Sequence, residues 1–211
     1  MFLLRIELPE TPGTLGRIAT AMGEIGADIQ SLEIVEHNDG YAIDDFTVDL
    51  PAHVLPDTLV SACQSVEGVH VRFLSRHSID WGIESDSALL TEMAENPDQA
   101  IDIFVQKAPV AFRSSWAALL RRDGEEVTAL KATDRAPDFA TDGVSALGDL
   151  TVPRTFDLPA EWLPQWGLTI IALAPLGDKS TIVLGRQGGP NFLSSELTRL
   201  KHLASLASDY Q

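Results

Sequence analysis

The residues best placed to do chemistry lie in a short turn, Pro9 to Gly13, between two runs of different periodicity. Phe2 to Leu8 alternates apolar and polar residues, which predicts a strand with one buried face. Thr14 to Ile25 repeats its apolar residues at helical spacing. The turn therefore leads directly into the start of a helix, where the first backbone N–H groups lack partners within the helix.

Three of these donors would be the N–H groups of Gly13, Thr14 and Leu15. Because the start of a helix carries the positive end of its dipole, the site favours an anion such as a ligand carboxylate. Gly13 permits close approach of that ligand. A second interpretation stays open, in which Pro12 and Gly13 merely shape a tight turn and Glu10 is a solvated acid.

The first 75 residues continue in the order βαββαβ. Ile29 to His37 and Tyr41 to Leu50 are predicted strands, joined by a hairpin turn at Asn38-Asp39-Gly40. A second helix is predicted for Pro56 to Val66 and a last strand for Val69 to Leu74. The predicted apolar face of the first helix consists of Leu15, Ile18, Ala19, Met22 and Ile25.

Two short motifs stand at the two ends of the first helix, Pro12-Gly13-Thr14-Leu15 and Gly26-Ala27-Asp28-Ile29. Together with the element order they resemble the ACT domain, a ferredoxin-like module that binds amino acids in regulatory proteins. The resemblance covers residues 2 to about 75 and implies that Asp28 lies near the ligand, where it could accept the ammonium group. In that family another subunit commonly completes the pocket, and many members serve only as assembly surfaces. The resemblance implies these ligand-binding residues: Glu10, Thr11, Pro12, Gly13, Thr14, Leu15, Asp28 and Ile29.

The pattern changes near residues 76–87, so we expect an ACT domain at 1–78, a linker at 79–87 and a second domain at 88–211. Asn96 followed by Pro97 predicts the capped start of a helix. Asp123-Gly124 predicts a hairpin between two strands. A further pair of apolar strands, Leu168 to Ala174 and Thr181 to Leu184, and a final helix complete an expected antiparallel sheet flanked by helices.

The closing run is similar to the end of a GAF domain, a small-ligand sensor and dimerisation module. The residues that carry the resemblance are Ala174 to Gly177, Leu184-Gly185-Arg186, Phe192 and Glu196-Leu197. The fold class we expect is therefore α+β, with a ferredoxin-like ACT domain followed by a GAF-like domain.

A long connection, Asp134 to Leu150, separates the predicted strands of the second domain. The resemblance implies that this region caps a pocket, for which a mobile surface loop is the alternative. Trp162 and Trp166, which flank Pro164, are candidates for a wall of that pocket, and the alternative is that both are core residues.

Composition excludes several classes of function. A net charge of −16 disfavours nucleic acids and anionic membrane surfaces as partners. The one cysteine, Cys63, lies on an apolar helix face, which favours a buried inert thiol in a cytoplasmic protein. The five histidines lack metal-ligand spacing, and no phosphate-loop or nucleophile-elbow motif is present. The adjacent acids Asp44 and Asp45 favour an exposed edge or a hairpin twist over acid/base catalysis.

We therefore expect a non-catalytic cytoplasmic regulatory protein, without a cofactor or metal, that binds an amino acid or similar small zwitterion at an ACT subunit interface. The GAF-like domain would be a second sensor or a dimerisation module, and the protein a homodimer or higher homo-oligomer with a possible protein partner. The alternative is a ligand-free assembly module or an accessory subunit of a metabolic enzyme.

Overall fold

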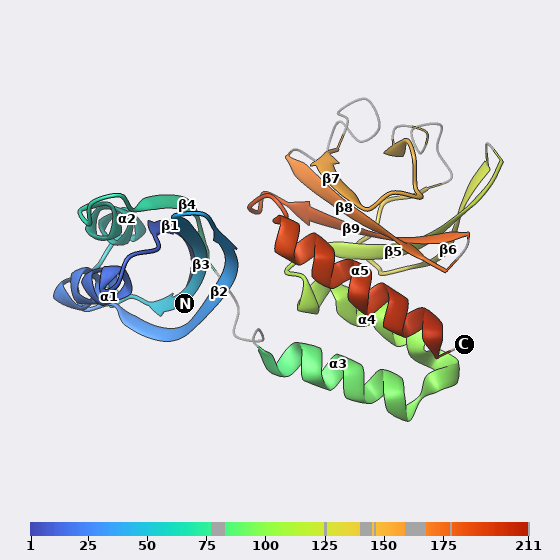
Figure 1. Cartoon of the computed structure of the whole chain (residues 1–211), viewed down its shortest axis with the longest axis horizontal. Coiled ribbons are helices and arrows are strands. Elements are labelled where there is room, and N and C mark those ends of the chain that lie inside the picture. The colour runs from blue at the N-terminus through green and yellow to red at the C-terminus, as the bar shows by residue number, and fades with distance from the viewer. Residues whose placement is uncertain are drawn as a thin grey trace. The chain divides into compact units, whose positions relative to one another are not determined.

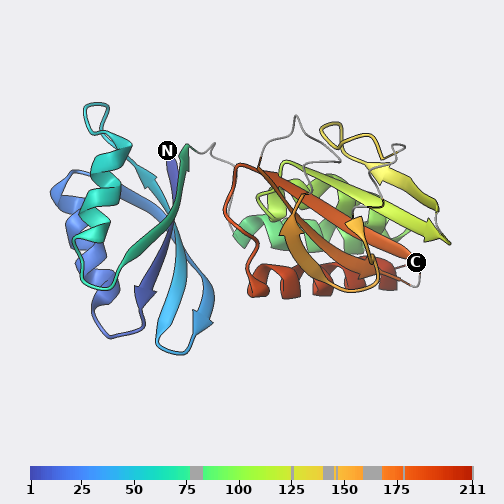
Figure 2. The same cartoon turned by 90° about the horizontal axis from the view of Figure 1, so that it is seen from above.

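The chain forms two compact units, Met1–Asp80 and Trp81–Gln211. Figures 1 and 2 show the computed structural model, which describes residues 1–76, 83–124, 126–139, 145, 147–158, 168–177 and 179–210. The helix α3 begins at Ile83, so the last part of the expected linker 79–87 is helical. The residues 77–82 at the boundary lie outside the described part of the chain.

The N-terminal unit is a ferredoxin-like βαββαβ fold, as the sequence predicted. Its sheet has the order β2-β3-β1-β4 with antiparallel neighbours, and both helices cover one face (Figure 2). The elements are β1 (Phe2–Pro9), α1 (Thr14–Glu24), β2 (Asp28–Asn38), β3 (Tyr41–Asp49), α2 (Pro56–Gln64) and β4 (His70–Arg76).

The core of this unit packs the helices against alternate residues of the sheet. On α1 the buried face is Thr14, Ile18 and Met22, whereas Leu15 and Ala19 are exposed. The predicted face was therefore wrong at Leu15 and Ala19. The buried residues recur every four positions, so the sheet covers only a narrow stripe of the helix.

Asp44 and Asp45 do not lie at an edge, because β3 is an inner strand between β2 and β1. Asp45 accepts two hydrogen bonds from Arg5, with Nε–Oδ1 at 2.7 Å and Nη2–Oδ2 at 2.9 Å. Asp44 shares the helix-covered face with Phe46, since alternate residues of a strand face the same side. The sequence hid this arrangement because strand order is not visible in a local pattern.

The C-terminal unit is α+β, with an antiparallel sheet of order β6-β5-β9-β8-β7 flanked by helices (Figure 1). This confirms the predicted fold class. The helices are α3 (Ile83–Glu95), a 3-10 turn (Pro97–Gln99), α4 (Ala100–Ala111) and α5 (Ser194–Asp209). The strands are β5 (Trp116–Asp123), β6 (Glu126–Ala132), β7 (Arg154–Asp157), β8 (Thr169–Leu176) and β9 (Ser180–Gln187).

Two local features of this unit differ from the prediction. Asn96 does not cap α4; its side chain instead donates a hydrogen bond to the carbonyl of Glu92 and closes α3. The short strand β7 was missed, because Arg154 to Asp157 contains one apolar residue, Phe156, and gives no alternation to detect.

The two faces of this sheet carry separate apolar clusters. One packs under α3, α4 and α5, while the other gathers Trp116, Phe139, Leu147 and Leu150. Described residues of the Asp134 to Leu150 connection thus cover a core instead of forming a mobile surface loop. Trp162 and Trp166 lie outside the described residues.

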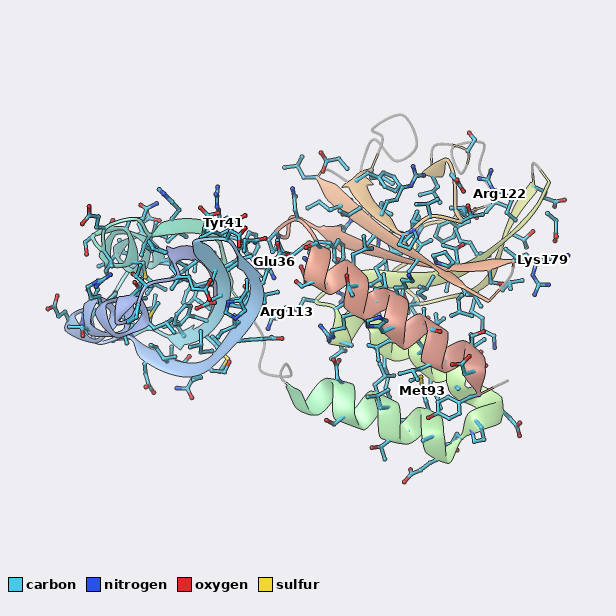
Figure 3. The ribbon with its side chains drawn as sticks, viewed as in Figure 1. Glu36, Tyr41, Met93, Arg113, Arg122 and Lys179 are labelled. Atoms are coloured by element: carbon cyan, nitrogen blue, oxygen red, sulfur yellow. The ribbon has the colours of Figure 1, made fainter. Side chains whose placement is uncertain are left out.

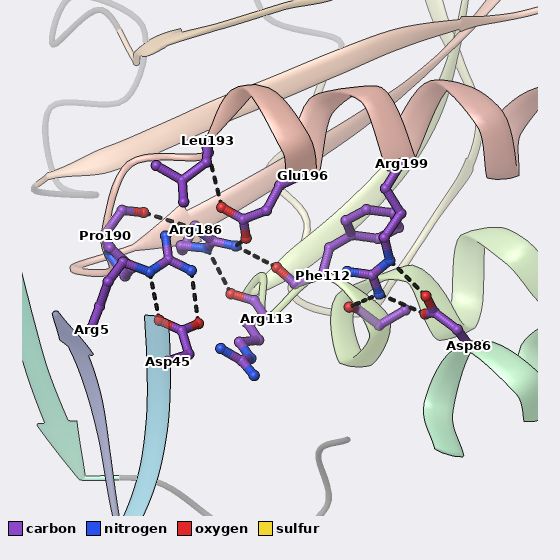
Figure 4. A network of polar contacts seen from close by, with 11 residues as sticks. Arg5, Asp45, Asp86, Phe112, Arg113, Arg186, Pro190, Leu193, Glu196 and Arg199 are labelled. Carbon is purple, nitrogen blue, oxygen red and sulfur yellow. Dashed lines mark hydrogen bonds and ion pairs between the residues drawn. The ribbon is translucent and has the colours of Figure 1, made fainter. Parts of the chain in front are cut away.

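Three of the residues that resemble a GAF domain, Arg186, Phe192 and Glu196, belong to a buried cluster (Figure 4). The guanidinium of Arg186 donates to the carbonyls of Phe112, Arg113 and Pro190 and to the carboxylate of Glu196, at 2.6 to 2.9 Å. It also stacks on Phe192, 3.8 Å from the ring centroid. This motif therefore has a structural role: it ties the end of β9 to the start of α5.

Candidate functional site

The turn before α1 is open and held in a left-handed conformation. Gly13 has φ +90°, and a Cβ built there would meet nothing within 4 Å. The turn is fixed to the neighbouring hairpin by a hydrogen bond of 3.1 Å from the Glu10 N–H to the Gly40 carbonyl. Glycine therefore adopts the left-handed conformation without strain, and the space beside it remains free for a ligand.

The start of α1 presents some, but not all, of the predicted donors. The Thr14 N–H donates to the Thr11 carbonyl at 3.2 Å, so this donor was predicted wrongly. Among the described residues, the N–H groups of Gly13 and Leu15 have no acceptor, and no side chain caps the helix. Two donors at the positive end of the helix dipole can thus receive a carboxylate.

The side chains around this turn form a short polar chain that ends in a cation. The hydroxyls of Thr11 and Thr14 lie 2.8 Å apart, and Arg17 Nη2 donates to the Thr14 hydroxyl at 3.0 Å. Thr14 is buried, while Thr11 and Pro12 are exposed. Sequence reasoning missed Arg17, although it lies one helical turn after Thr14 and is one of four basic residues in the first 80.

Glu10 pairs with a residue that the sequence did not single out. Its carboxylate lies 3.0 Å from His37 Nδ1, and both side chains are about half exposed. The register of β2 shifts between Ile34 and Glu36, which re-aims the following residues and was not visible in the sequence. Such an exposed pair adds little stability to the fold.

Asp28 and Ile29 lie at the other end of α1. The helix has 11 residues, so it holds these two residues about 16 Å from Gly13. The exposed carboxylate of Asp28 accepts a hydrogen bond of 2.7 Å from Gln30, and Ile29 packs against the core. One chain therefore does not bring Asp28 and the donors of the Gly13 turn to the same small ligand.

Asp44 is a buried acid that the sequence did not assign to the interior. Its side chain is 1% exposed, and Oδ1 has no hydrogen-bond partner among the described residues. Burial raises its pKa from 3.8 to about 6, with the charge of His37 lowering it in part and Asp45 raising it. The Asp44 carboxyl therefore holds its proton to a higher pH than an exposed aspartate does.

The second unit contains a separate, open pocket of about 360 Å³ between α4 and the end of β6, and Pro109 and Val110 form its apolar lining. Its polar lining comprises Gln106, Ser114, Ser115, Thr133, Asp134 and Arg135. The size suits a small polar molecule.

No group of three histidine, cysteine or acidic side chains is arranged to hold a metal ion in the part of the chain that the structure describes. Within the same residues, no helix has the length and hydropathy needed to cross a bilayer.

Comparison with known proteins gives partial likenesses. No family model matches the chain. A segment of 73 residues is 36% identical to the NAD-dependent malic enzyme 1 of Bacillus subtilis, which amounts to 34% of this chain and 17% of that enzyme. The chain thus spans less than a fifth of this relative.

Three solved structures are similar in part. A GAF domain assigned to a sensor histidine kinase of Pseudomonas syringae pv. tomato matches with 17% identity and TM-score 0.44, over 60% of this chain and 86% of that chain. A formyltetrahydrofolate deformylase of Pseudomonas putida KT2440 matches with 11% identity and TM-score 0.32, over 45% and 38%. An unknown protein of Galdieria sulphuraria matches with 13% identity and TM-score 0.32, over 99% and 89%. All three scores lie below 0.5, so these likenesses carry nothing about ligand or activity.

Proposed function

We propose that this protein is a cytoplasmic regulatory protein, not an enzyme, whose ACT-like N-terminal unit binds an amino acid or a similar small zwitterion. The observation that carries the proposal is the open start of α1, where the N–H groups of Gly13 and Leu15 lack acceptors among the described residues. The ligand carboxylate accepts hydrogen bonds from these two N–H groups, and the nearby Arg17 adds a positive charge.

The ligand's ammonium group requires an acceptor, and the proposed one is Asp28 of a second copy. Since α1 separates Asp28 from Gly13 within one chain, only two copies could place both groups around one small molecule. Leu15 on α1 and Leu32 and Ile34 on the edge strand β2 are 36%, 43% and 49% exposed. A homodimer that buries these side chains and the open edge of β2 would form such a shared site.

The proposal that the protein is not an enzyme draws on Cys63. Its thiol is buried in the N-terminal core, and burial raises its pKa to about 11. A thiol of that kind is a poor nucleophile.

A second candidate is a ligand-free assembly module or an accessory subunit of a metabolic enzyme. The likeness of a 73-residue segment to part of an NAD-dependent malic enzyme favours it. In this alternative, the exposed apolar residues of β2 dock a protein and the start of α1 stays empty.

The test is a thermal-shift screen of the purified chain against the twenty amino acids, followed by Gly13→Ala and Asp28→Ala. A ligand at a hundred times its dissociation constant stabilises the native state by about 2.7 kcal/mol, which a melt detects readily. Both variants should lose the response. Gly124→Ala, a left-handed glycine of the second unit, and Asp39→Ala, an exposed acid at the hairpin tip, are matched controls and should keep it.

Mixing the two inactive variants then tests whether the site is shared. In a mixed dimer one site combines Gly13 of one copy with Asp28 of the other, so about a quarter of the sites should recover at equal mixing. No recovery after subunit exchange would rule out the shared site. Silence across the amino acids would overturn the ligand proposal and favour the assembly module.

A further inference from the structure

Three strands of the second unit hold one short segment, Leu147 to Leu150, against the face of the sheet opposite the helices. Arg122 of β5 donates to the Gly148 carbonyl at 2.9 Å, and Arg154 of β7 donates to the Leu147 carbonyl. The Thr181 hydroxyl of β9 donates to the Leu150 carbonyl at 2.7 Å. Consecutive carbonyls accept these bonds, so the two guanidiniums lie close together.

The two arginines have far more donors than acceptors. Each guanidinium carries five N–H groups, and each makes one hydrogen bond within the described residues. The Nε atoms of both Arg122 and Arg154 are buried without a partner in that same part of the chain. Buried unpaired donors are rare in native proteins and commonly indicate a bound water or ion.

Charge is also unbalanced at this place. Among the described residues, no carboxylate forms an ion pair with either arginine. Asp149 is an exposed acid of this segment, and its pKa is lowered mainly by hydrogen bonds from Thr151 and also by the charges of Arg154 and Arg122. Two cations therefore face one solvated carboxylate, although the chain carries a net charge of −16.

Tethering the segment does not require these charges, because Thr181 achieves the same with a neutral hydroxyl. The arginines are also held rather than loose. Arg154 lies over the ring of Phe156 at 4.9 Å, and Gly148, at φ +60°, lets it approach where a Cβ would lie 2.8 Å from Nη2. Held side chains with spare N–H groups are suited to bind a ligand.

We propose that Arg122 and Arg154 form an oxyanion site that binds the carboxylate or phosphate group of a small molecule. Both residues are partly exposed, so part of each side chain meets solvent although its Nε is buried. The planar fork of arginine matches both kinds of group. The overall negative charge of the chain repels polyanions, which favours a small ligand. This site lies in the second unit and does not depend on the amino-acid site proposed for the first.

The test measures binding of inorganic phosphate and of succinate to the full chain by calorimetry, with sodium chloride at matched ionic strength as the reference. Arg122→Gln and Arg154→Gln should each weaken binding at least about tenfold, since each removes a charge-assisted hydrogen bond. Arg121→Gln is the matched control: it removes the same charge from the adjacent residue of β5, whose side chain points to the other face of the sheet. It should bind like the wild type.

Binding of phosphate alone or of succinate alone identifies the group, and binding of both supports a general oxyanion site. Binding of neither to the wild type would overturn the proposal, as would an equal loss in Arg121→Gln. If a glutamine variant fails to fold, the ¹H–¹⁵N NMR signals of the two Nε–H groups in the wild type test the proposed site instead. They should shift on addition of the bound anion; unmoved signals would refute the site.

Discussion

At the scale of single residues, the buried position of Asp44 lowers the stability of the folded state at neutral pH. It is buried, Oδ1 has no partner among the described residues, and its pKa rises from 3.8 to about 6. At about 1.4 kcal/mol for each pKa unit, that difference lowers the free energy of unfolding at pH 7 by about 3 kcal/mol. Because the folded state holds the proton more tightly, this contribution favours the fold below pH 4 and is lost as the pH rises through 6.

We predict that Asp44→Asn is more stable than the wild type at pH 7.5, by roughly 1 to 3 kcal/mol. The advantage should shrink between pH 6 and pH 4, where the wild-type carboxyl becomes neutral. Urea denaturation of both proteins at several pH values measures the difference in the free energy of unfolding. The contributions of the other acids cancel when one pH profile is subtracted from the other. Parallel curves would show that Asp44 keeps its ordinary pKa.

Only some residues of the candidate site could be predicted from the sequence. The turn residues and Gly13 were identifiable, because proline and glycine between two periodic runs indicate a helix start. The hydrogen bond that occupies the Thr14 N–H, the contact of Arg17 with Thr14, and the pairing of His37 with Glu10 were not. These depend on how one turn folds back and on a β-bulge, and neither leaves a periodic signal.

At the scale of elements, a buried ion pair between Arg186 and Glu196 helps to join β9 to α5. Glu196 lies at the third position of α5, where one carboxylate oxygen accepts the Leu193 N–H at 2.9 Å and the other accepts from Arg186 at 2.7 Å. Both charged side chains are under 10% exposed. Removing one partner of such a pair takes the opposite charge away from the buried group that remains.

We predict that Glu196→Gln destabilises the second unit by about 2 to 4 kcal/mol. The variant retains the shape of the side chain and removes its charge. Asp102→Asn, at the exposed pair with Lys131, is the control and should cost less than about 1 kcal/mol. Equal losses in the two variants, measured by guanidinium denaturation, would contradict the structural role of the Arg186 cluster.

Elements were predicted well where their residues alternate or repeat cleanly, as in β1, α1 and the hairpins. The short strand β7 was missed because its register is set by pairing with β8, which supplies the apolar residues. The exposed Leu15 and Ala19 were placed inward because periodicity identifies an apolar stripe without showing how much of it the sheet covers.

At the scale of the whole molecule, the proposed homodimer depends on the edge strand β2. We predict that the double variant Leu32→Gln, Ile34→Gln weakens self-association by at least about tenfold, because each lost apolar contact counts twice across a twofold axis. Leu55→Gln, at a leucine that is 68% exposed before α2, should leave it unchanged. Sedimentation velocity measures both, and a monomeric wild type would refute the dimer.

Charge adds a further constraint on that dimer. Up to Asp80 the chain has 4 basic and 13 acidic residues, so each N-terminal unit carries 4 − 13 = −9. Two such units repel each other when their β2 edges approach, and salt screens exposed charges with a Debye length of about 10 Å at 0.1 M. Self-association should therefore strengthen as sodium chloride rises from about 0.02 to 0.2 M. An interface held by ion pairs between the copies would show the reverse, so the sign of the salt dependence distinguishes apolar edge packing from complementary charge.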